Sequence, residues 1–336
     1  MRRLALLALA LATALSLAGA ASARSRGTTL NLVAYSTPKT VMGKLISMWN
    51  DTPQGQGVSF TQSYGASSSQ ALAIAAGQPT DIAFLSTGLD VGTLVRAGLV
   101  DPGWAKAPYG GIAADSVVVF VVRNGNPKQI KHWSDLVKPG VQVVTPNPFS
   151  SGSAKWNVLA AYGAMRRLGK TDKQATAFVQ TLFQHVVAQD SSARNATNTF
   201  IAGKGDVLLT YESEAFAARQ AGTDLRFVIP RQSLLIELPI VPLKNSPNLA
   251  AAKQFISFVQ TEKAQEVFGQ YGFRPVEPVA LKKYFGTQLS IKPGIFTIGD
   301  RLFGGWAKAD RTWFDPATGR MVAIERKVGG PTGTTS

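Results

Sequence analysis

Four short turns rich in small and hydroxyl residues can bind an anion, and each opens directly into a predicted helix. The first N–H groups of a helix have no partner inside it, and the helix dipole adds about half a positive charge there. Taken alone, any one of these turns is explained by a Ser or Thr that caps the helix. Four of them, each after a predicted strand, predict an anion site built from neutral donors. The turns are Ser36-Thr37, Gly65-Ala66-Ser67, Ser150-Ser151-Gly152-Ser153 and Ser191-Ser192-Ala193.

Other candidate residues form no recognised catalytic pattern. His132 and His185 lie far apart without partners at metal-ligand spacing, and we interpret both as structural or surface residues. Glu212 and Glu214 can serve as a base in an enzyme, but carboxylates at a helix start also stabilise the helix dipole, which is the interpretation we favour. The sequence therefore predicts no catalytic residue, no metal and no cofactor.

The first 23 residues have the pattern of a secretory signal peptide. Arg2 and Arg3 precede an apolar run, and small residues follow up to Ala23, after which we expect cleavage. The chain has no cysteine, so we expect neither disulfides nor a lipid anchor, and no later segment has the apolar length of a membrane span. These features predict a periplasmic or otherwise extracytoplasmic protein.

The charge balance is strongly positive. Without the signal peptide, 33 basic residues stand against 20 acidic ones, a surplus of +13. Such a surplus suits a protein that binds nucleic acid, an anionic membrane or small anions. The basic residues are scattered and the export signal disfavours nucleic acid, which leaves attraction of small anions or a generally basic surface.

Short β-rich runs alternate with helical patterns, which predicts an α/β fold with a largely parallel sheet. Ligands of such folds bind at the carboxyl ends of the strands, where the four turns lie. The 313 residues after the signal peptide are enough for two lobes. We place the chain crossings between the lobes near Ala113 to Ser116 and near Pro230 to Leu234. We expect strands at 29–35, 58–62, 81–85, 115–122, 141–144, 206–210 and 234–243, and helices around 41–49, 133–137, 158–165, 175–182, 212–220 and 255–259.

Several ordered blocks resemble the periplasmic sulfate-binding protein family, from about Leu30 to Ala309. The blocks are 123–130, 135–141, 145–157, 190–200, 205–208 and 303–309. The resemblance implies a two-lobed periplasmic binding-protein fold (type II), with a mixed, mostly parallel sheet in each lobe and a dehydrated sulfate in the interlobe cleft. We expect residues 28–113 with 231–315 in lobe I, 114–230 in lobe II, and 316–336 as a partly disordered tail.

The resemblance also implies the function and the ligand contacts. The protein would be a monomer and not an enzyme, and its closed form would deliver sulfate to the membrane permease of an ABC importer. Lobe I would offer the backbone near Ser36 and the N–H or hydroxyl of Ser67. Lobe II would offer the hydroxyl of Ser151 and the N–H groups of Gly152, Ser153 and Ala193.

Three residues depart from the family pattern. Ser36 stands where the family commonly has Asp, Ser153 replaces a glycine, and Tyr211 stands in place of a tryptophan. An indole N–H only donates, whereas a phenol donates or accepts. An all-donor site rejects hydrogen phosphate, because the proton of that anion finds no acceptor. We expect Tyr211 to donate, which keeps the preference for sulfate.

Three alternatives stay open at this point. The first is a binder of thiosulfate, molybdate or another tetrahedral oxyanion on the same fold. The second is a periplasmic transferase or hydrolase that uses Glu212 or Glu214 as its base. The third is a structural or adhesive envelope protein, which would show no stabilisation by oxyanions.

Overall fold

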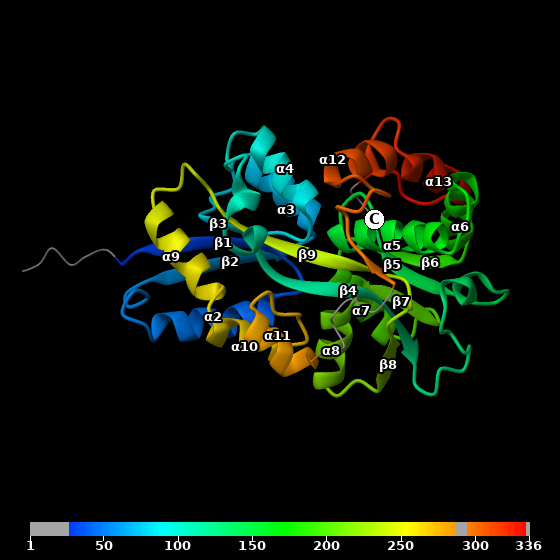
Figure 1. The fold of residues 1–336 in the computed structure, drawn as a ribbon, viewed down its shortest axis with the longest axis horizontal. Helices are drawn as coiled ribbons and strands as arrows, with labels where there is room; N and C mark the ends of the chain where they lie inside the picture. The colour runs from blue at the N-terminus through cyan, green and yellow to red at the C-terminus, as the bar shows by residue number, and fades with distance from the viewer. Residues whose placement is uncertain (1–26, 287–293, 334–336) are drawn as a thin grey trace, which may run out of the picture.

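The computed structural model describes residues 27–286 and 294–333; the predicted signal peptide lies outside these ranges. Within them, the strands form one ten-stranded sheet in the order β2-β1-β3-β9-β4-β7-β5-β6, with β10 beside β9 and β8 beside β4 (Figure 1). The strands are β1 (Thr29–Tyr35), β2 (Ser59–Gly65), β3 (Ile82–Phe84), β4 (Ile112–Arg123), β5 (Val143–Pro146), β6 (Val186–Asp190), β7 (Val207–Tyr211), β8 (Leu225–Val228), β9 (Ser233–Pro242) and β10 (Ile295–Phe296).

Helices cover both faces of this sheet (Figure 1). No helix in the described ranges has the length and apolar character needed to cross a bilayer. The α-helices are α2 (Lys39–Asn50), α3 (Ser67–Ala75), α4 (Gly88–Arg96), α5 (Gly152–Arg167), α6 (Asp172–Gln184), α7 (Ala193–Ile201), α8 (Glu212–Gln220), α9 (Leu249–Val259), α10 (Glu262–Gln270), α11 (Pro278–Phe285), α12 (Trp306–Ala309) and α13 (Arg320–Val328).

The molecule has two lobes, which differ in the strands that they contain (Figure 1). In lobe I, β1 pairs in parallel with β2 and β3. In lobe II, β5 pairs in parallel with β6 and β7. Strand β9 runs antiparallel to β3 and β4, and β4 runs antiparallel to β7. The sheet is therefore mixed, with a parallel part in each lobe, as the resemblance implies, although it runs through both lobes and does not form a separate sheet in each.

Strands β4 and β9 connect the lobes. Residues 112–117 of β4 pair with residues 235–239 of β9, after which β9 continues to β3 and β4 continues to β7. The first segment contains the expected crossing at Ala113 to Ser116, and the second begins directly after the expected one at Pro230 to Leu234. Alternate residues of β4 belong to different apolar clusters, with Val117 and Val119 in one and Val118 and Phe120 in the other. This double burial explains the valine-rich sequence of the strand.

The C-terminal part of the chain packs on lobe II. The Trp306 ring lies edge-on to that of Trp156 in α5, with centroids 4.6 Å apart. Residues 295–315 were expected in lobe I, but their aromatic side chains fill the surface of α5, where Gly163 leaves room for Phe296. The segment after residue 315, expected as a tail, includes helix α13. Its last residues, 334–336, lie outside the described ranges.

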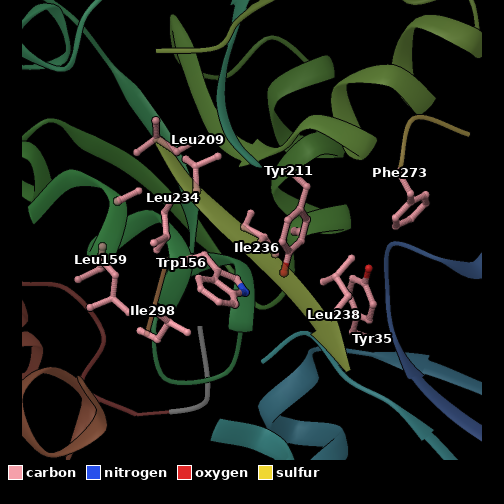
Figure 2. Close-up of a cluster of buried hydrophobic side chains, with 14 of the residues drawn as sticks. Tyr35, Trp156, Leu159, Leu209, Tyr211, Leu234, Ile236, Leu238, Phe273 and Ile298 are labelled. Atoms are coloured by element: carbon pink, nitrogen blue, oxygen red, sulfur yellow. The ribbon is translucent and has the colours of Figure 1, made fainter. Parts of the chain in front are cut away.

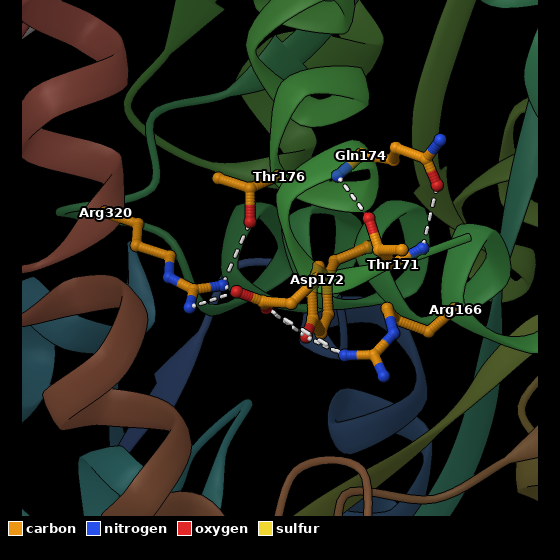
Figure 3. A network of polar contacts seen from close by, with 7 residues as sticks. Arg166, Thr171, Asp172, Gln174, Thr176 and Arg320 are labelled. Carbon is orange, nitrogen blue, oxygen red and sulfur yellow. Dashed lines mark hydrogen bonds and ion pairs between the residues drawn. The ribbon is translucent and has the colours of Figure 1, made fainter.

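A polar network holds α13 against α6 (Figure 3). Asp172, at the start of α6, accepts two hydrogen bonds from the Arg320 guanidinium, at 2.8 and 2.9 Å. It also accepts one from the Tyr162 hydroxyl at 2.7 Å, and that hydroxyl accepts one from Arg166 at 2.9 Å. The Arg320 guanidinium lowers the pKa of Asp172. A bidentate ion pair of this kind fixes the direction in which the last helix packs.

Two carboxyl groups face each other on the crossing strands. Asp115 of β4 is the register partner of Glu237 of β9. The backbone of Asp115 also exchanges two hydrogen bonds with that of Arg274, at 2.7 and 2.8 Å. The Arg274 guanidinium is bound to Glu212, at 2.6 and 3.2 Å. Burial and the neighbouring Glu237 raise the pKa of Asp115 to about 8, while Arg274 acts in the opposite direction.

This carboxyl pair predicts a loss of stability with rising pH. An unfolded Asp has a pKa of about 3.9. A group whose pKa is raised by folding makes its full contribution to stability at pH values below its pKa in the unfolded chain. This contribution is lost as the pH rises to about 8. The Tm of Asp115→Asn minus the Tm of the wild type should therefore be several degrees larger at about pH 8 than at about pH 5. Thermal unfolding across this range tests it, and parallel profiles of the two proteins would contradict it.

Candidate functional site

The starts of helices from both lobes meet at one place. The Ser68 N–H of α3 donates to the Ser150 carbonyl before α5, over 3.1 Å between the lobes. Arg194, in the first turn of α7, reaches the Thr37 carbonyl after β1 at 3.4 Å. Gly152, the first residue of α5, lies against Ser86, which follows β3. The carboxyl ends of strands from the two parallel parts thus bring the predicted turns together.

The backbone N–H groups at these turns are free to bind a ligand. Neither α3 nor α5 has a side-chain cap at its start, although Ser151 stands at the cap position of α5. At α7 the cap is Ser192, which accepts from the Asn195 N–H at 3.2 Å. In the part of the chain that the structure describes, no acceptor within the protein binds the N–H groups of Ser36, Ser67, Gly152, Ser153 and Ala193.

Ser67 can offer only its backbone. Its hydroxyl donates to Asp90 at 2.6 Å and accepts from the Ser86 N–H at 2.8 Å. The sequence alone does not distinguish whether the hydroxyl or the N–H of Ser67 faces a ligand. Because the hydroxyl proton already has an acceptor inside lobe I, the N–H is the group that stays available.

Four buried hydroxyl groups around the turns lack a partner in the described part of the chain. A buried polar group without a partner costs about 1–3 kcal/mol, so each of these hydroxyls is available to bind a ligand or water. Only Ser153 among them is a predicted ligand residue, and Thr37 belongs to one of the four predicted turns. The other three stand within two residues of predicted site residues, so their position in the turns was the available signal. The four hydroxyls belong to Tyr35, Thr37, Ser153 and Ser213.

Tyr211 connects the two lobes at this place. It is 1 % exposed, precedes α8, and its hydroxyl lies 2.6 Å from that of Ser86. Its ring centroid is 6.0 Å from that of Tyr35, and Figure 2 shows both rings with Trp156 along β9. Burial raises the pKa of Tyr211 far above its ordinary value, so the phenol keeps its proton at neutral pH. It is available as a hydrogen-bond donor.

Charged side chains near the helix starts have partners within the protein. Arg194 binds Glu214 at 2.9 Å. Lys155 donates to Ser68 at 2.5 Å, and the Ser68 hydroxyl donates to Asp90 at 2.7 Å. Burial lowers the pKa of Lys155, and Asp90 opposes this effect. These partners leave the neutral N–H and hydroxyl groups as the donors of the site.

Comparison with known proteins decides the family. Residues 30–274 match the model of the bacterial extracellular solute-binding proteins. This chain belongs to that family. A sulfate-binding protein of Synechococcus elongatus is 36% identical over 301 residues, with 85% of each chain covered. One of Escherichia coli K12 is 39% identical over 276 residues, which cover 77% of this chain and 81% of the relative.

A known structure shows the fold of this solute-binding protein. The sulfate-binding protein SubI from Mycobacterium tuberculosis H37Rv is 42% identical and superposes with a TM-score of 0.81, covering 86% of this chain and all of SubI. The similarity confirms the type II periplasmic binding-protein fold. The chain is a solute-binding protein and not an enzyme.

The acidic pair of this solute-binding protein agrees with that conclusion. Glu214 is bound to Arg194, and Glu212 forms a buried ion pair with Arg274 at 2.6 Å. In the described ranges, no group of three metal-binding side chains occurs. His185 hydrogen-bonds the Val141 carbonyl at 2.9 Å, away from the helix starts. Both carboxylates therefore hold structure in place, and neither is free to act as a base.

The buried ion pair predicts a large loss of stability on substitution. Glu212→Gln leaves the Arg274 guanidinium buried without a counter-charge, which should cost about 3 to 5 kcal/mol. Glu266→Gln is the matched control, because Glu266 pairs with Lys283 at the surface and its loss should change stability little. Urea denaturation measures both variants. Equal, small losses would show that the Glu212 pair contributes no more than a surface pair.

Proposed function

We propose that this solute-binding protein captures sulfate between its lobes and delivers it to the permease of an ABC importer. The observation that carries the proposal is the set of unpaired N–H groups at the starts of α3, α5 and α7, in both lobes. Arg194 and Lys155 beside them already have partners within the protein. Such donors suit an anion that carries two charges and no proton. Several relatives, among them SubI, are named as sulfate-binding proteins.

The proposed contacts divide between the lobes. Lobe I offers the N–H groups of Ser36 and Ser67. Lobe II offers the remaining donors, and the anion is fully coordinated only when the lobes are closed. Binding then shifts the population toward the closed form, which the permease recognises. The lobe II donors are the Ser151 hydroxyl, the N–H groups of Gly152, Ser153 and Ala193, and the Tyr211 hydroxyl.

The cellular setting follows from the same proposal. Residues 1–23 act as a cleaved signal peptide, and the mature protein is a monomer without a lipid anchor in the periplasm or another extracytoplasmic space. Lobe I consists of residues 28–113 and 231–286. Lobe II consists of residues 114–230 and the segment from residue 295 that packs on α5 and α6. The crossing strands β4 and β9 act as the hinge.

Calorimetry with sulfate tests the function, with Gly152→Ala as the decisive variant. A Cβ at position 152 would lie 2.2 Å from the Ser86 Oγ and 2.9 Å from the Thr87 Cγ2, both across the cleft. Overpacking of this kind costs about 1–3 kcal/mol, so closure is hindered and sulfate affinity should fall about tenfold or more. Gly43→Ala is the control, because a Cβ there meets nothing within 4 Å.

Thermal shifts with thiosulfate, molybdate and phosphate define the ligand. At about 100 times its Kd, sulfate adds about 2.7 kcal/mol to stability, which raises Tm by roughly 5 °C. A Pseudomonas aeruginosa relative named as a thiosulfate-binding protein is 33% identical, so thiosulfate is the closest competitor. A larger shift with thiosulfate than with sulfate would replace the proposed ligand, and no shift with any oxyanion would refute the proposed function.

A further inference from the structure

Ser86 is a buried residue at the carboxyl end of β3 that no sequence motif marks. It is fully shielded from solvent. Its N–H donates to the Ser67 hydroxyl at 2.8 Å, and its carbonyl accepts from the Trp156 indole at 2.8 Å. One partner lies in lobe I and the other in lobe II. The backbone of Ser86 is thus held from both sides, which fixes the direction of its side chain.

The Ser86 hydroxyl lies between Tyr211 and the start of α5. Its oxygen is 2.6 Å from the Tyr211 hydroxyl. It is also the atom nearest to the space where a Cβ of Gly152 would stand, at 2.2 Å. The N–H of Gly152 is one of the unpaired groups of the site. Two bonded hydroxyls therefore adjoin the helix start that would hold the anion.

The pair has two protons, of which one forms the bond between the two hydroxyls. With an unprotonated anion, Ser86 donates to Tyr211 and Tyr211 donates to the anion. With a singly protonated anion the order reverses: the anion donates to Tyr211, Tyr211 donates to Ser86, and Ser86 donates to a second oxygen of the anion. Every proton has an acceptor in both cases.

Carboxylates near the site are unavailable for this task. Asp90 accepts from the hydroxyls of Ser67 and Ser68, and Glu214 is bound to Arg194. An indole at position 211 would have no acceptor to offer. The Tyr211 and Ser86 hydroxyls are thus placed to take the proton of a ligand in a site that otherwise donates.

We propose that Ser86 is a specificity-determining residue. Together with Tyr211 it forms a reversible hydroxyl pair that lets the site bind a singly protonated tetrahedral oxyanion, such as hydrogen phosphate, in addition to an unprotonated one. The inference rests on the proposed oxyanion-binding function. Sulfate stays the preferred ligand because the backbone N–H groups only donate, and the pair reduces the penalty for the protonated anion.

Two matched ligand pairs test the inference at about pH 8. Sulfate and selenate carry no proton there, whereas phosphate and arsenate carry one. Ser86→Ala leaves the Tyr211 proton without its acceptor when a protonated anion binds. The ratio of the phosphate Kd to the sulfate Kd should rise about tenfold, the effect of one unsatisfied buried hydroxyl. The arsenate to selenate ratio should rise equally, and Tyr211→Phe should raise both ratios.

Ser69→Ala is the control, because Ser69 is exposed on the same helix as Ser67 and its loss should leave both ratios unchanged. Calorimetry gives the Kd values. The inference is overturned if Ser86→Ala changes the sulfate and phosphate Kd values by the same factor, or if the wild type binds sulfate but no phosphate. Failure of the wild type to bind any of the four anions would refute the proposed function itself.

Discussion

Removing a doubly charged anion from water is the constraint on which this structure depends. Every lost water must be replaced by a donor, because an ion buried without such bonds is costly. Helix starts supply donors without adding a full charge. One helix start supplies too few, so the starts of α3, α5 and α7 must be brought together from both lobes. The helix starts meet because they follow the carboxyl ends of the parallel strands in the two lobes.

The charged groups support this arrangement by keeping partners within the protein. Glu212 and Glu214 bind arginines, and Ser68 in lobe I donates to Asp90 and accepts from Lys155 in lobe II. These contacts position the helix starts and leave neutral donors toward the ligand. We expect the positive surplus of the chain to act at longer range, by raising the local anion concentration. The groups that bind the anion are thus different from the charges that attract it.

Much of the fold was predictable, because hydrophobic periodicity and turn residues act locally. Strand β1 and helix α8 have the predicted limits, and the Val-rich β4 was recognised by its burial. Strand β2 extends through Gly65 into a predicted loop, because Ser63 and Tyr64 pair with β1. Strand β6 was implied only by the turn that follows it, and its limits were not predicted, since it is short and half-buried. Ser86 escaped prediction because its role depends on partners in the other lobe, which no local pattern encodes.

The most direct test of the account is a crystal structure of the mature protein with sulfate bound. We expect the sulfate oxygens to lie within about 3.2 Å of backbone N–H groups at the starts of α3, α5 and α7 and of neutral hydroxyls. We also expect Arg194 and Lys155 to keep the partners that they have here. A lysine, an arginine or a metal ion in direct contact with the sulfate would contradict the central claim.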